Sequence, residues 1–351
     1  MVELVQLNGI TFEFPSMLSR VADSMFWMSR YIERAENIAR FLDVNLHLTL
    51  DLGDSIDQQW SPLVATTGDH EVFAERYGPA TRENAWQFLT FDRDNFNSIV
   101  SCLYSARENA RTMRGSLPSE VWEELNKFYL FVRGAAAAES AERSGEFLSE
   151  VKRFSQLLVG IMESLMSRDE AWHFARMGRS IERADKTSRI LDVKYFILLP
   201  TSSEVGTPLD VIQWSALLKS ASALEMYRRV RGRITPENVV GFLMLDHDFP
   251  RSVKYCLHRT EESLRAITGS PSGTYRTLAE RRVGRLRAEF EFTQPADIIQ
   301  VGLHEFIDSF QTKLNDLDAA VFETFFAVKP LAAEIHSAPA QSQTQTGASA
   351  E

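Results

Sequence analysis

Charged side chains recur at helical spacing in two separate stretches of the sequence. Glu33 in the first stretch and Glu182 in the second each share a predicted helix face with basic and amide residues three, four and seven positions apart. Such a carboxylate can act as a general base or hold an amine, and guanidinium groups bind carboxylates or phosphates through paired hydrogen bonds. The candidate binding residues are Arg30, Arg34, Asn37 and Arg40 around Glu33, and Arg179, Arg183, Lys186 and Arg189 around Glu182.

Salt bridges without a ligand are the structural alternative for these residues, either in solvent or between domains. Each exposed ion pair contributes only ~0 to 1 kcal/mol to stability. The positions of the glutamate and three of the arginines are kept in both stretches, although most exposed positions differ. This retention favours a binding site or a specific interface, and the structural interpretation stays open beside it.

Paired aspartates form a weaker candidate site, Asp92 with Asp94 and Asp246 with Asp248. Carboxylates are ligands that a hard cation such as Mg²⁺ prefers. Two carboxylates are few for a metal site, and local backbone chemistry explains both. We expect Asp94 and Asp248 to cap the helices that follow, and the other aspartate of each pair to make a turn. No metal site is therefore predicted.

Other chemistry-bearing residues are predicted to be structural. Cys102 and Cys256 stand at matching places in helical patterns, where a cysteine is usually a small buried hydrophobe, and no neighbouring base is indicated. Trp60 and Trp214 are expected in the core. The sequence has no Gly-rich phosphate loop, no Gly-x-Ser-x-Gly, no His-Glu-x-x-His and no dinucleotide fingerprint. These absences disfavour a self-sufficient nucleotide-using enzyme.

Helices must position the charged residues, because apolar residues near them follow the helical repeat. Ile32, Ala35, Ala39 and Leu42 form one stripe, and Ile181, Ala184, Ser188 and Leu191 form another. Further amphipathic patterns cover about 144–167, 275–290 and 297–325, and no convincing strand pattern occurs. An all-α bundle is predicted.

Two pairs of segments within the chain are similar in sequence. Residues 30–44 match residues 179–193 at nine of fifteen positions, and residues 59–116 match residues 213–270 at 20 of 58, in both cases without a gap. Order and spacing are kept between the two pairs of segments. We therefore predict an internal duplication that folds as two pseudo-symmetric helical units.

Bulk composition narrows the class of protein. A formal net charge of −10 disfavours nucleic acid as a partner, and two cysteines cannot form a disulfide framework. No stretch has the ~18 apolar residues that a membrane span needs, and no leader pattern is present. The expected location is the cytoplasm. Residues 331–351 are poor in large apolar residues and are predicted to be a disordered tail.

The segment from Met17 to Asp43, with its repeated Ile-Glu-Arg-Ala, strongly resembles the start of the bacterial alpha-E family, formerly a domain of unknown function. The resemblance covers about 17–327 and implies an all-helical protein. Members typically begin near Met17, so residues 1–16 are interpreted as an N-terminal extension or a misassigned start. We expect the two units at 17–165 and 166–330.

Further properties are implied by this resemblance alone. Such proteins are encoded beside, or fused to, circularly permuted ATP-grasp proteins, often with transglutaminase-like proteins and sometimes with a proteasome-like Anbu peptidase. ATP-grasp enzymes use ATP and Mg²⁺ to join a carboxylate to an amine. No cofactor intrinsic to this chain is implied, and Glu33 and Glu182 become the signature glutamates, with the basic residues around them.

Three functions are compatible with these observations. The leading hypothesis is an accessory component of an ATP-grasp amide- or peptide-ligase system, which binds a peptide, an amine or the ligase through an Arg/Glu-lined groove. A stand-alone hydrolase or transferase acting on the ligase product, with glutamate as general base, is the second. A non-catalytic scaffold is the third. Charged faces that converge on a cavity would disfavour the scaffold.

Overall fold

The computed structural model describes residues 2–7, 10–15, 19–52, 60–65, 67–137, 144–197 and 207–327. This part of the chain is helical apart from one two-stranded hairpin, which confirms the predicted all-α class. The tail predicted at residues 331–351 lies outside the described residues. None of the described helices is both long and apolar enough to cross a membrane.

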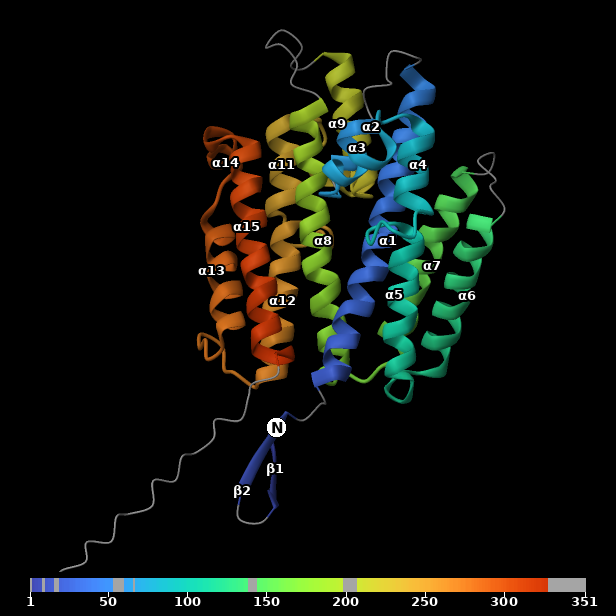
Figure 1. Cartoon of the computed structure of the whole chain (residues 1–351). Coiled ribbons are helices and arrows are strands. Elements are labelled where there is room, and N and C mark those ends of the chain that lie inside the picture. The colour runs from blue at the N-terminus through green and yellow to red at the C-terminus, as the bar shows by residue number, and fades with distance from the viewer. Residues whose placement is uncertain are drawn as a thin grey trace, which may run out of the picture.

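Two long helices, α1 (Ser19–Leu52) and α8 (Glu170–Ile197), lie side by side in the middle of the molecule (Figure 1). The two predicted apolar stripes are buried on these helices. Gly178 of α8 lies against the backbone of Phe26 in α1, where a methyl group would come within 2.3 Å of the Phe26 carbonyl oxygen. Glycine at this position lets the two backbones approach closely.

Three longer helices flank α1 on one side and three flank α8 on the other (Figure 1). Two of each set pack directly on the central helix, and the third packs on those two. The flanking helices are α5 (Ile99–Thr112), α6 (Ser119–Ala137) and α7 (Ser144–Leu165) beside α1, and α12 (Val253–Thr268), α13 (Leu278–Phe292) and α15 (Leu303–Val321) beside α8.

Short helices gather around the C-terminal ends of the central pair (Figure 1). Trp60 and Trp214 are buried there, as predicted. These helices are α2 (Trp60–Ala65), α3 (His70–Tyr77), α4 (Arg82–Thr90), α9 (Pro208–Ser220), α10 (Leu224–Val230), α11 (Pro236–Leu245) and α14 (Pro295–Val301). A 3₁₀ turn, Arg114–Ser116, and a π-helical turn, Phe322–Phe326, complete the described helical elements.

The predicted caps of α5 and α12 are wrong. Ser98 and Ser252 are the cap residues, and each hydroxyl accepts a hydrogen bond from a backbone amide of the first turn. Asp94 and Asp248 lie four positions too early to reach these amides. A serine that follows a run of turn residues satisfies the free amides as well as an aspartate does.

The long amphipathic pattern predicted at 297–325 is interrupted. Gly302 has a φ angle of +106° and separates α14 from α15. Only glycine adopts such an angle readily. Ile298 before the break and Ile307 after it are buried, whereas Ile299 and Val301, next to the glycine, are exposed. The apolar sequence pattern continues through the break, so periodicity alone did not predict it.

The N-terminal extension contains the strands that the sequence analysis did not predict. Strands β1 (Val2–Leu7) and β2 (Ile10–Pro15) pair antiparallel, with Val2 opposite Pro15. Alternation of apolar and polar residues in the second strand is typical of a strand, but it extends over few residues. In the described part of the chain these strands pair only with each other.

Helix α1, in the predicted first unit (17–165), packs along α8, in the predicted second unit (166–330). The division into two units stays a prediction from the sequence. Aligned residues make the same local contacts in both: Thr81 and Thr235 each cap a helix by accepting from the amide three positions later. Their origin by duplication stays a prediction from the sequence.

Candidate functional site

Glu33 and Arg34 of α1 exchange paired hydrogen bonds with Glu182 and Arg183 of α8. Arg34 donates from Nε to Glu182 Oε1 at 2.7 Å and from Nη2 to Oε2 at 3.0 Å. Arg183 donates in the same manner to Glu33, at 2.9 and 2.7 Å. Each arginine fork therefore holds both oxygens of the glutamate on the opposite helix. We call these contacts the reciprocal Glu–Arg pairs.

Both carboxylates of the reciprocal pairs are buried. The exposed fraction is 1% for Glu33 and 0% for Glu182. The charged face of α1 is therefore covered by the rest of the bundle and is not an exposed row of salt bridges. Ions in such a place lose their hydration, which only good geometry and further hydrogen bonds can offset.

Further cations surround Glu182. Arg30 Nε donates to Glu182 Oε2 at 3.0 Å, and Lys186 Nζ lies 3.7 Å from Oε1. Arg30 also donates to Asp318 of α15, and Lys186 lies 3.0 Å from Asp185. The predicted binding residues on this side are thus brought together, but around a carboxylate of the protein itself.

Glu33 receives its additional cation from a different element. Arg251, in the turn before α12, donates from Nη1 to Glu33 Oε1 at 3.0 Å and to Asn37 Oδ1 at 3.2 Å. In the aligned segments Asn37 matches Lys186 and Arg251 matches Asn97. The extra positive charge therefore comes from the turn near one glutamate and from the helix near the other. Arg251 was not predicted because its aligned residue is uncharged.

The network holds its glutamates in the ionised form. Burial alone would raise the pKa of Glu33, but the guanidinium groups of Arg183 and Arg251 outweigh it and lower the pKa to about 2. For Glu182, Arg34, Lys186 and Arg30 likewise outweigh burial and lower the pKa well below its ordinary value. Neither carboxylate has the near-neutral pKa that suits a general base.

A second pair of acids was also missed by the sequence analysis. Glu36 accepts from Arg40 Nε at 3.0 Å, and Asp185 accepts from Arg189 Nε at 3.0 Å, each four positions earlier on the same helix. An acid stands at this aligned position in both stretches, so the signal was present. Arg40 and Arg189 are thus already paired within their own helices.

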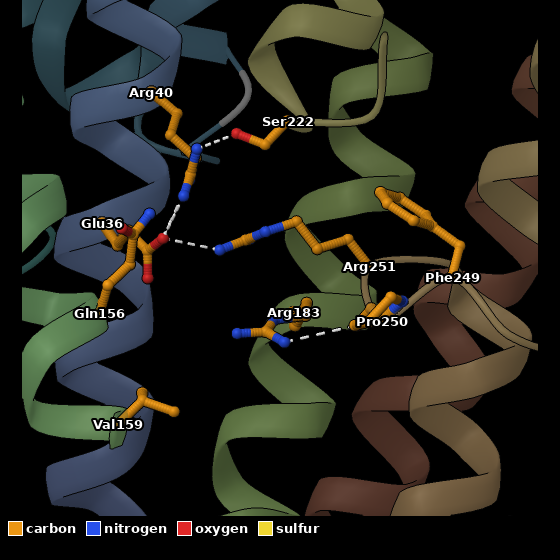
Figure 2. Close-up of a pocket in the computed structure, with 9 residues that line it drawn as sticks. All are labelled: Glu36, Arg40, Gln156, Val159, Arg183, Ser222, Phe249, Pro250 and Arg251. Atoms are coloured by element: carbon orange, nitrogen blue, oxygen red, sulfur yellow. Dashed lines mark hydrogen bonds and ion pairs between the residues drawn. The ribbon is translucent and has the colours of Figure 1, made fainter. Parts of the chain in front are cut away.

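Figure 2 shows a cavity of about 330 Å³ beside α1, which we call the first seam cavity. Guanidinium groups of Arg40, Arg183 and Arg251 reach it from three different elements. Gln156 and Val159 of α7 close the side next to α1. Of the residues predicted around the glutamates, Arg40 and Arg183 therefore line an accessible space.

A second seam cavity of about 200 Å³ lies at matching positions. Four residues in its wall align with four in the wall of the first seam cavity. The aligned residues are Arg34 with Arg183, Asp185 with Glu36, Arg189 with Arg40, and Asn97 with Arg251. Arg30, Lys186 and Asp318 also line it, so the carboxylate of Asp318 contributes negative charge here.

Arg179, the remaining predicted binding residue, lines a third cavity of about 290 Å³ between α7, α8 and α12, which we call the outer cavity. Its Nη2 donates to Glu163 of α7 at 2.9 Å. Arg30, the aligned residue of α1, pairs in turn with Asp318 of α15. Each of these two arginines therefore joins a central helix to an outer one.

The paired aspartates are engaged in local structure. Asp92 and Asp246 each accept from the backbone amide two positions later, at 2.9 and 3.0 Å, which confirms the predicted turns. Asp92 also forms an ion pair with Arg76 at 2.9 Å. The side chains of Asp94 and Asp248 are 88% and 98% exposed. Within the described residues no group of three or more His, Cys, Asp or Glu side chains is placed to hold a metal ion.

Cys102 and Cys256 are buried, as predicted. Burial raises the pKa of each thiol to about 12, so both are un-ionised at neutral pH. Each thiol lies near a backbone carbonyl oxygen of the preceding turn. A nucleophilic cysteine needs the opposite shift.

Curated relatives of this chain occur in mycobacteria. It is 25% identical over 323 residues to the uncharacterized protein Mb2597 of Mycobacterium bovis and to the uncharacterized protein MT2643 of Mycobacterium tuberculosis. The matches cover 86% of this chain and 35% of each relative, so the chain spans about a third of the length of these relatives. No solved structure matches the chain significantly.

A family model matches residues 17–326, most of the chain. The family is Alpha-E, described as a predicted alpha-helical domain with a conserved ER motif. Glu33-Arg34 and Glu182-Arg183 are two such dipeptides within the matched range, and they form the reciprocal Glu–Arg pairs. The chain belongs to the Alpha-E family.

Proposed function

We propose that this chain is an accessory component of an ATP-grasp amide- or peptide-ligase system, in which the partner ligase uses ATP and Mg²⁺. Its role is to bind a peptide, an amine or the ligase at the cavities beside α1 and α8. The observation that carries the proposal is that the charged residues of these helices converge on cavities lined by arginine. A purely docking surface would instead be flat and exposed.

Binding is favoured over catalysis by the state of the glutamates. Glu33 is buried, its pKa is lowered to about 2, and both of its oxygens accept from Arg183. A hydrolase would need a base that reaches its substrate and titrates near neutral pH. The arginines, by contrast, keep N–H donors directed into accessible space.

The length of the relatives supports a partner. In Mb2597 and MT2643 the matched region is 35% of the protein, so a long further segment is covalently joined to it. Two units joined in one chain stay at high effective concentration and commonly act together. The alpha-E resemblance implies that an ATP-grasp protein is the other unit.

Co-purification with the neighbouring circularly permuted ATP-grasp protein tests this proposal. We expect the two proteins to elute together in size-exclusion chromatography. The variant Glu150→Gln, which changes an exposed pair with Arg153 on α7, should form the same complex. Separate elution at micromolar concentration would contradict the accessory role, and hydrolysis of amides by this chain alone would favour the stand-alone enzyme.

A further inference from the structure

The outer cavity and the first seam cavity adjoin. Both are lined by Arg183 and Pro250, and Arg183 Nη1 donates to the Pro250 carbonyl oxygen at 3.3 Å between them. Figure 2 shows this contact, drawn as a dashed line below Arg251. The two spaces are therefore lobes on either side of one arginine.

Positive charge exceeds negative charge around these two lobes. Six arginines line them: Arg40, Arg183 and Arg251 in the first seam cavity, and Arg176, Arg179 and Arg259 with Arg183 again in the outer cavity. The carboxylates that pair with these six are Glu33, Glu36, Glu163 and Glu262. The six cations exceed these four anions by two, and this local excess of positive charge favours an anionic ligand.

The arginines of the first seam cavity retain hydrogen-bond donors for a ligand. Arg40, Arg183 and Arg251 each use three N–H groups in hydrogen bonds to other described residues. A guanidinium group has five N–H donors. Burial, together with the guanidinium groups of Arg183 and Arg40, lowers the pKa of Arg251 more than Glu33 and Glu36 raise it.

The walls also contain carbon surface, which favours an organic ligand over an inorganic anion. Val159 and Phe249 line the first seam cavity, and Trp172 and Tyr255 line the outer cavity, with Pro250 between them. Pockets for organic ligands combine such apolar walls with a few fixed polar groups.

We propose that the two lobes form one site for an organic ligand that places one carboxylate in each lobe, such as an acidic dipeptide bound through its two side chains. Only the choice of a peptide rests on the proposed function. The second seam cavity is not part of this site, because its wall shares no residue with either lobe.

Isothermal titration calorimetry of the full chain with the dipeptide Glu-Glu tests the site. We expect saturable binding of Glu-Glu and at least roughly ten-fold weaker binding of Gln-Gln, because each carboxylate lost removes a charge-assisted contact. Arg40→Gln and Arg259→Gln, one in each lobe, should each weaken Glu-Glu binding by roughly ten-fold or more. Arg153→Gln, an exposed arginine of α7, should leave it unchanged.

Arg40 is buried and Arg259 is 38% exposed, so the second variant keeps the test valid if the first fails to fold. Equal binding of Gln-Gln, tighter binding of pyrophosphate, or a larger loss in Arg189→Gln than in Arg40→Gln would each overturn the site. If the complex with the ligase forms but the dipeptide does not bind, the proposed site is overturned and the proposed function is not. Dipeptide binding without any ligase complex would overturn only the proposed function.

Discussion

The two buried glutamates are stabilised by arginines from the opposite helix. Replacing a buried ion pair with apolar residues is often neutral, whereas removing one partner leaves an uncompensated charge. Each glutamate of the reciprocal pairs is held by more than one cation, so its removal takes a carboxylate partner from several buried cations at once. The network therefore makes both glutamates indispensable for stability, whatever ligand the arginines bind.

Glu182→Gln should destabilise the protein by ~3–5 kcal/mol, because Arg34 loses its buried carboxylate partner and Arg30 and Lys186 each lose one of two. The change is nearly isosteric, so packing is kept. Urea unfolding measures the free energy of unfolding. The control Glu150→Gln removes an exposed pair and should leave this free energy nearly unchanged. Equal stability of the two variants would contradict the role of the network.

The same assay tests whether the turn residue Arg251 supplies to Glu33 the positive charge that the helix residue Lys186 supplies to Glu182. Arg251→Asn should cost ~3–5 kcal/mol, since Glu33 and Glu36 lose a buried partner. Adding Asn37→Lys recreates the arrangement around Glu182 and should restore at least ~1 kcal/mol, a coupling typical of contacting residues. Asn37→Lys alone should destabilise, because Arg251 is then a like charge nearby. If the effects of Arg251→Asn and Asn37→Lys on the free energy of unfolding are strictly additive, a lysine at position 37 does not replace Arg251.

At the scale of the elements, the packing of α1 on α8 requires their backbones to approach closely at Gly178. Gly178→Ala places a methyl group 2.3 Å from the Phe26 carbonyl oxygen, so the helices must separate, at a cost of ~1–3 kcal/mol. The matched change Gly160→Ala in α7 meets no atom within 4 Å and should stabilise by up to ~1 kcal/mol through helix propensity. Thermal unfolding of the two variants measures this difference as a change in melting temperature. A stabilising Gly178→Ala would show that the two backbones are not in contact.

The whole molecule should lose stability in acid. Glu33 and Glu280 have pKa values lowered from 4.5 to about 2, and the pKa of Glu182 is also lowered. Their contribution is complete above pH ~4.5 and is lost as pH falls toward ~2, because the unfolded chain then binds more protons. Burial raises the pKa values of Asp192 and Asp318, which partly offsets the loss above about pH 4. Urea unfolding between pH 7 and 2.5 checks this, and a constant free energy below pH 4.5 would contradict it.

Much of the fold could be predicted because helical periodicity is strong near the duplicated segments. Ile32, Ala35 and Ala39 follow the helical repeat at spacings of three and four, and all are buried. Local breaks were harder to predict. Gly302 interrupts an apolar pattern that continues in the sequence on both sides of it, and the hairpin β1–β2 rests on a short alternation. Periodicity reports which residues share a face, but it is insensitive to one backbone angle.

The site could be predicted only in part. Spacing grouped Arg30, Glu33 and Arg34 on one face, but it does not tell what covers that face, and here α8 does. Arg251 joins the network from a turn more than 200 positions away in sequence from Glu33, a contact created by tertiary packing. The charged face of α1 could therefore be predicted from the sequence. Its burial against α8 and its contact with Arg251 could not.

The most direct test of the central claim, that this chain assists a ligase without being the catalyst, is ATP turnover by the ATP-grasp partner. Turnover is measured over pooled amino acids and amines, with and without this chain. We predict no turnover by this chain alone and an increase of at least several-fold when it is added to the partner. Unchanged turnover in its presence, or amide chemistry by this chain alone, would contradict the account.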